Sequence, residues 1–241
     1  MIDAARLSEV IRGDVTLRAV EPHIYSLAAP GDETNEYDGV FGAVYDRVAC
    51  SGLYNRLVWG YRTRVYHSLC LDALRASSGW MLDAGCGSLA FTARTYAASA
   101  TRPVVLLDQS VSLLRMAKRR LVQANGRVPG NVVFLHGDVL RLPFAPGTFT
   151  TVLALNLLHV LPALPAALRE FRRILTEDGG LTCTTLVKGA RLADRYLDRL
   201  AKAGLLRPRS IDQVLASFDE AGMQHTHGVE GNLAIIHRRV A

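Results

Sequence analysis

The chain has 241 residues, of which 49% are hydrophobic and 21% are charged, and its formal net charge is +6. This composition is typical of a globular chain rather than a disordered one, and the length allows one α/β domain with a modest extension. The longest apolar stretch, residues 152–161, is interrupted by Asn156 and His159 and is too short to span a bilayer. The basic residues are scattered along the chain, so the net charge alone does not indicate a nucleic-acid surface.

The four cysteines, Cys50, Cys70, Cys86 and Cys183, form no Cys-x-x-Cys pair and no zinc-like spacing. Residues 1–14 lack the apolar run of a secretory signal. We therefore expect reduced thiols, no bound metal and a cytoplasmic location.

The segment 1–76 is expected to form a helical cap that holds a substrate. Aromatic and apolar residues recur there at helical spacing in two runs, 37–45 and 54–65. Packing of the apolar face of each expected helix onto the core explains this spacing. Tyr45 and Tyr54 are in addition candidates for contact with a substrate.

In the segment 77–241, short apolar strands alternate with helices. The expected strands are 80–83, 104–107, 131–135, 148–155 and 181–187. Ser110 suits the N-cap of a helix that ends near Gly126, and Pro162 and Pro165 open another that is stopped at 178–180.

Two further helices, about 190–203 and 210–221, precede strands near 223–229 and 232–239. The short connection between these last strands favours an antiparallel hairpin. The alternation predicts a Rossmann-like, mostly parallel seven-stranded sheet with helices on both faces.

The strongest local motif is Asp-Ala-Gly-Cys-Gly-Ser at residues 83–88, which follows a strand and precedes a helix that begins at about Ala90. Gly85 and Gly87 allow a tight turn and a close approach of the backbone to a ligand. In open α/β sheets, ligands bind beyond the carboxyl ends of the strands. The motif therefore predicts a nucleotide-like ligand at this edge.

Two further carboxylates end or follow the next strands at the same edge. Asp108 lies 21 residues after Gly87, where a carboxylate can accept hydrogen bonds from both ribose hydroxyls. Asp138 follows the third strand, and its carboxylate can accept a hydrogen bond from an adenine amino group.

With these features, the chain resembles the class I S-adenosylmethionine-dependent methyltransferases of the small-molecule branch, which includes enzymes similar to quinone-biosynthesis C-methyltransferases. The matching stretches are 81–88, 104–110, 136–144 and 149–180. The resemblance implies S-adenosylmethionine as cofactor and, as its binding residues, Asp83, Gly85, Cys86, Gly87, Asp108, Gln109, Asp138, Val139 and Asn156.

In these implied roles, the glycine loop and Asn156 lie at the methionine end of the cofactor, Asp108 binds the ribose, and Asp138 flanks the adenine. The chain departs from the family at Leu89, where a third glycine is common. We expect this leucine to narrow the loop or to shift the cofactor.

Two alternatives stay open. The series Gly85-x-Gly87-x-x-Ala90 also fits a dinucleotide loop, which would make the protein an NAD(P)-dependent oxidoreductase. Asp83 argues against it, because dinucleotide loops usually have an uncharged residue there. The chain is alternatively a protein that binds S-adenosylmethionine without catalysis.

Methyl transfer from a sulfonium needs alignment of the acceptor and exclusion of water, and a base helps if the acceptor is a hydroxyl or an acidic carbon. His159, just beyond the fourth strand, is the candidate base, although it also suits core packing. That strand ends in Asn156-Leu-Leu-His159, unlike enzymes that methylate base amino groups. We expect a small-molecule acceptor and no nucleic acid.

Overall fold

The computed structural model describes residues 4–27, 50–99, 102–189 and 191–239. Five parallel strands form the centre of its sheet: β3 (Met81–Ala84), β4 (Val104–Asp108), β5 (Val132–His136), β6 (Phe149–Ala154) and β7 (Leu175–Lys188). The other strands are β1 (Arg18–Glu21), β2 (Ile24–Ser26), β8 (Arg209–Ser210), β9 (His225–Glu230) and β10 (Leu233–Arg238). The order is β1-β2-β5-β4-β3-β6-β7-β10-β9, with β8 paired to β7.

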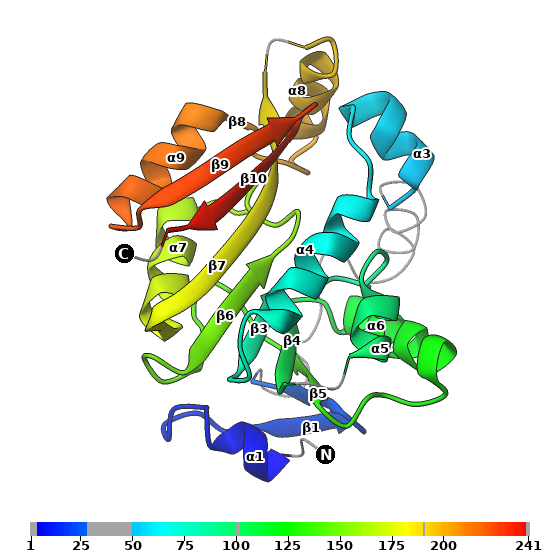
Figure 1. Cartoon of the computed structure of the whole chain (residues 1–241), viewed down its shortest axis with the longest axis vertical. Helices are drawn as coiled ribbons and strands as arrows, with labels where there is room; N and C mark the ends of the chain where they lie inside the picture. Colours follow the sequence, from blue (N-terminus) through cyan, green and yellow to red (C-terminus); the bar gives the residue numbers. More distant parts are fainter. Residues whose placement is uncertain (1–3, 28–49, 100–101, 190, 240–241) are drawn as a thin grey trace.

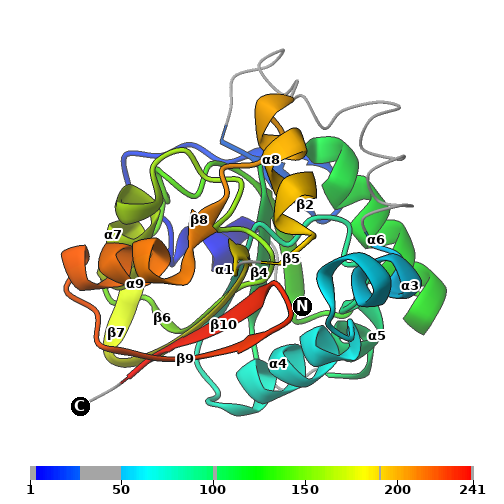
Figure 2. The ribbon, with the colours of Figure 1, turned by 90° about the horizontal axis from the view of Figure 1, so that it is seen from above.

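Helices cover both faces of this sheet (Figures 1 and 2). One face packs against α1 (Ala4–Ser8), α7 (Leu164–Ile174) and α9 (Ile211–Glu220). The other packs against α4 (Arg64–Arg75), α5 (Ala93–Ala98) and α6 (Val111–Asn125). A third apolar cluster joins the π-helix η1 (Asn55–Trp59), which continues α3 (Gly52–Tyr54), to α8 (Asp194–Lys202).

The alternation of side chains along β3 explains how one strand serves both faces. Leu82 and Ala84 lie in the cluster with α7, whereas Met81 lies in the cluster with α5 and α6. Successive side chains of a strand point to opposite faces, and both faces are buried here. Asp83 therefore projects from the face that α5 covers.

The expected ends of helix α6 and the final hairpin are confirmed. The Ser110 hydroxyl accepts a hydrogen bond from the Leu113 amide, and Gly126 ends α6 with a left-handed φ of 73°. Strand β10 runs antiparallel to both β7 and β9.

The sheet is larger than the seven strands expected from the sequence. The hairpin β1–β2 extends it, because β2 pairs in parallel with β5 from Ile24 opposite Phe134. The two-residue strand β8 adds a further pair beside β7. These segments are too short to give a readable alternation. Similarly, the expected stop at 178–180 lies inside β7, and α5 starts at Ala93, after turns that follow the glycine loop.

Parts of the segment 1–76 belong to the sheet and its covering layer, so the segment is not a separate helical unit. The helix expected over 54–65 is interrupted, because Gly60 adopts a left-handed φ of 77° after η1 and α4 starts at Arg64. Helix α4 then covers the sheet, and the hairpin β1–β2 belongs to it. The run 37–45, with Tyr45, lies outside the described residues.

Candidate active site

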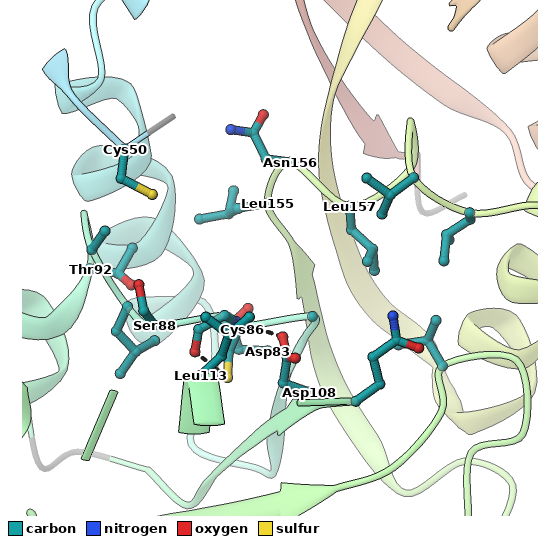
Figure 3. A pocket seen from close by; sticks show the side chains of 18 of the residues that line it. Cys50, Asp83, Cys86, Ser88, Thr92, Asp108, Leu113, Leu155, Asn156 and Leu157 are labelled. Atoms are coloured by element: carbon teal, nitrogen blue, oxygen red, sulfur yellow. Dashed lines mark hydrogen bonds between the residues drawn. The ribbon is translucent and has the colours of Figure 1, made fainter. Parts of the chain in front are cut away.

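A cavity of ≈ 390 Å³ lies at the carboxyl ends of β3, β4, β5 and β6 (Figure 3). This volume is within the range of small-ligand sites. All nine residues that the sequence pointed to for a cofactor line it, namely Asp83, Gly85, Cys86, Gly87, Asp108, Gln109, Asp138, Val139 and Asn156.

The glycine loop is folded tightly against the end of β4. The amides of Gly85 and Cys86 both donate to the Leu107 carbonyl, at 2.8 and 3.0 Å. Gly85 has a φ of 69°, and a Cβ there would lie 2.6 Å from the Leu157 side chain. A larger residue at Gly85 would therefore be strained in its backbone and would clash.

Leu89 keeps a glycine-like backbone although it carries a side chain. Its φ is 56°, in the left-handed region, and its side chain is only 2% exposed. It packs in the apolar cluster with α5 and α6 while also lining the cavity. The left-handed conformation costs roughly 1–2 kcal/mol, which burial of the leucine side chain offsets.

Asp108 fixes the glycine loop from the neighbouring strand. One carboxylate oxygen accepts from the Gly87 amide at 2.8 Å, and the other accepts from the Ser110 amide at 2.9 Å. Each carboxylate oxygen has a second lone pair, so the side chain can accept further hydrogen bonds from a ligand. The geometry thus holds Asp108 in place for such contacts.

Asp83 has a buried carboxyl group, of which only one oxygen accepts a hydrogen bond from the described residues. Its Oδ2 accepts from the Tyr96 hydroxyl at 2.7 Å, whereas its Oδ1 is buried with no hydrogen-bond partner among the described residues. Burial raises the pKa of Asp83 to about 7, against the lowering effect of the Tyr96 bond, and the Asp108 charge raises it further. A nearby cation would stabilise the ionised form.

Asn156 follows the end of β6 and carries a second unpaired acceptor. Its φ is 55°, a conformation that Asn tolerates, and its backbone amide donates to the Thr184 hydroxyl at 2.8 Å. Its Oδ1 is buried without a partner among the described residues. Figure 3 shows Asn156 on the side of Cys50, away from Asp83 and Asp108.

Asp138 is exposed at the rim of the cavity, where its Oδ1 accepts from the Leu140 amide at 2.9 Å. This bond leaves Oδ2 as an acceptor for a ligand. Val139 beside it is buried and supplies an apolar surface.

The other part of the cavity lining is largely apolar, and the sequence did not indicate it. It includes Tyr66, Phe91, Leu155, Val160 and Leu205. The rings of Tyr66 and Phe91 lie 5.0 Å apart, and the Tyr66 hydroxyl donates to the Tyr61 hydroxyl at 2.7 Å. These residues come from distant parts of the chain, and no motif joins them in the sequence.

Tyr54 and His159 are not among the described residues that line the cavity. Tyr54 packs edge-on against Trp59, at 6.1 Å between ring centroids. The His159 ring is buried, and its Nδ1 accepts from the Leu186 amide at 3.2 Å. Burial lowers the pKa of His159 to about 4, with a contribution from Arg209, so the ring is neutral at physiological pH. This geometry makes His159 a support for β7.

Within the described ranges, no helix is long and apolar enough to cross a membrane, and no three potential ligands gather to hold a metal ion.

Comparison with known proteins identifies the central part of the chain. Residues 81–179 match the family described as "Methyltransferase domain". The chain is 27% identical over 153 residues to 27-O-demethylrifamycin SV methyltransferase of Amycolatopsis mediterranei, covering 60% of this chain and 53% of that protein. It is 32% identical over 103 residues to demethylmenaquinone methyltransferase of Staphylococcus haemolyticus, covering 42% and 41%. The matched region thus spans about half the length of these relatives.

A solved structure shares the fold. Geranyl diphosphate C-methyltransferase from Streptomyces coelicolor, in complex with S-adenosyl-L-homocysteine, superposes with a TM-score of 0.59 at 13% identity, covering 73% of this chain and 76% of that one. Residues 81–179 therefore match a methyltransferase domain, and the Rossmann-like fold is shared with a solved methyltransferase structure.

Proposed function

We propose that the protein transfers a methyl group from S-adenosylmethionine to a small, largely apolar acceptor. The observation that carries this proposal is one cavity with two unlike parts. Its polar part is made by the glycine loop, Asp83, Asp108 and Asp138, and its apolar part includes Tyr66 and Phe91.

The polar part fits the functional groups of S-adenosylmethionine. The unpaired, buried Oδ1 of Asp83 suits the charge of the methionyl ammonium group. Asp108 suits a pair of ribose hydroxyls, and the remaining oxygen of Asp138 suits an adenine amino group. Asn156 offers a further acceptor toward the methionine end.

When bound, the cofactor supplies a methyl group that its positive sulfur has already activated. The residues of the chain then have to align an acceptor and to exclude water. We assign this task to the apolar wall of Tyr66, Phe91, Leu155 and Val160. The described lining contains no histidine, so we expect rate acceleration to come mainly from alignment.

Two further features support a small-molecule acceptor. The relatives are named for a demethylrifamycin and a demethylmenaquinone. The lining near Tyr66 is apolar, whereas nucleic-acid sites are strongly cationic. We also propose a cytoplasmic location, supported by four cysteines that form no disulfide.

The proposal is tested by incubating the protein with S-adenosylmethionine that carries a labelled methyl group and a panel of apolar phenols, quinols and enols. We expect label in an organic-extractable product. Phe91→Ala should raise the KM for the acceptor while leaving cofactor affinity unchanged. Tight cofactor binding with no turnover on any acceptor would instead make the protein a binder of S-adenosylmethionine.

A further inference from the structure

Two segments beside the cavity form one exposed surface, which we call the cap surface: residues 52–64 and 191–202. The Trp59 ring stacks on Tyr196 at 5.6 Å, and the Arg191 guanidinium lies against Gly60. Figure 1 shows α3 and α8 at the same end of the molecule. Cys50 and Gly204, just outside the two segments, line the cavity, so the cap surface borders it.

The cap surface exposes an unusual amount of aliphatic side chain. Leu53 is 68% exposed, Leu57 is 73% exposed and Leu192 is 85% exposed. Leu53 and Leu57 are four residues apart on the helical segment α3–η1, so they follow one another along one side of it. Among the described residues, the large aliphatic side chains exposed elsewhere are Val122 and Val229, at 40% and 51%.

The cap surface also holds most of the net charge of the protein. It contains seven cations and two carboxylates, a net charge of +5 within a chain whose net charge is +6. The cations are Arg56, Arg62, Arg64, Arg191, Arg195, Arg199 and Lys202, and all seven are exposed. One of the carboxylates, Asp198, is already paired with Lys188, and the other, Asp194, accepts from the Asn232 side chain.

We propose that the cap surface docks on an anionic lipid membrane. Protruding leucines can enter the boundary between headgroups and acyl chains, while the surrounding arginines contact anionic headgroups. Insertion of aliphatic side chains alone or attraction to anionic headgroups alone gives weak membrane binding, and the cap surface combines both. An acidic protein is the less suitable occupant, because protein interfaces rely on aromatic anchors seated in pockets, and Tyr196 is already stacked on Trp59.

Docking in this orientation brings the cavity close to the lipid. An apolar acceptor concentrates in the membrane and would reach the wall of Tyr66 and Phe91 over a short path. This consequence rests on the proposed function, whereas docking itself does not require methyl transfer.

The test is co-sedimentation of the full chain with vesicles, either of phosphatidylcholine alone or of an equal mixture of phosphatidylcholine and phosphatidylserine. We expect binding to the mixed vesicles that weakens as salt is added. The triple variant Leu53→Ser, Leu57→Ser, Leu192→Ser should lose at least about tenfold in affinity. The double variant Val122→Ser, Val229→Ser removes exposed aliphatic groups elsewhere and should bind like the wild type.

Circular dichroism and cofactor titration verify that each variant is folded. Absence of binding by folded wild-type protein would overturn the proposal, as would undiminished binding by the triple leucine variant. Capture by an immobilised acidic protein without vesicle binding would assign the surface to a protein partner and would also overturn it. Each of these outcomes leaves the assay for methyl transfer unaffected, so the two proposals fail separately.

Discussion

The substitution Asp83→Asn should stabilise the protein and weaken cofactor binding. The pKa of Asp83 is raised from 3.8 to about 7, mainly by burial. Because folding raises this pKa, the free energy of unfolding is largest below the unfolded pKa of 3.8, where the carboxyl is protonated in both states. This stability is lost as the pH rises through the folded pKa of about 7. Above pH 7, the ionised carboxyl costs roughly 4 kcal/mol relative to water. Asparagine carries no charge and can still accept from the Tyr96 hydroxyl.

A substitution that recovers half of this free energy, about 2 kcal/mol, would raise the Tm by roughly 4–8 °C for a chain of this size. The gain should be largest at about pH 8 and should shrink toward about pH 5, where the native carboxyl is already protonated. Loss of the charge opposite a ligand ammonium group should weaken binding of S-adenosylmethionine by about 30-fold or more.

Differential scanning calorimetry at the two pH values measures the stability change, and isothermal titration measures the affinity. Asp138→Asn is the matched control for the stability measurement, because Asp138 is exposed. An Asp83→Asn variant with an unchanged or lower Tm at the higher pH would refute the burial argument. Unchanged affinity would refute the assignment of Asp83 to the cofactor.

Three further predictions follow from the same site. Binding of a cationic ligand should release a proton from Asp83, so the affinity for that ligand should rise with pH through about 7. Calorimetry in buffers of different ionisation enthalpy measures the proton release, and its absence would contradict this prediction. The variant His159→Asn should keep an acceptor for the Leu186 amide and nearly full activity. The variant His159→Leu leaves that amide unpaired and should lower the free energy of unfolding by about 1–3 kcal/mol. A rate loss of about 100-fold in a folded Asn variant would instead make His159 the base. The variant Leu89→Gly should relieve backbone strain yet lower the Tm. The free energy lost with the buried side chain, about 2–5 kcal/mol, exceeds the roughly 1–2 kcal/mol of the left-handed backbone. A higher Tm would contradict this prediction.

The centre of the sheet and the grouping of polar residues at one edge of it were predictable from the sequence, for a physical reason. The buried parallel strands β3 to β7 include continuous apolar runs, and the glycine loop needs backbone conformations that Gly85 and Gly87 adopt easily. Because the carboxyl ends of parallel strands meet at one edge, Asp108 and Asp138 could be placed near the loop without any structure.

The apolar side of the cavity was not predictable in the same way. Tyr66 and Phe91 become neighbours only because α4 and the turn after the glycine loop pack together, and no spacing records that contact. His159 follows β6 closely in sequence, which suggested a position at the cavity, whereas the left-handed turn at Asn156 precedes a return of the chain toward β7. The strands β1 and β2 are three to four residues long and carry no periodicity.

The most direct test of the central claim is calorimetric titration of the purified protein with S-adenosylmethionine and S-adenosylhomocysteine, with NAD and NADP in parallel. We expect micromolar binding of the first two ligands, weakened in Asp108→Asn, and no binding of the dinucleotides. Binding of NAD or NADP in their place would make the cavity a dinucleotide site and would rule out methyl transfer from S-adenosylmethionine.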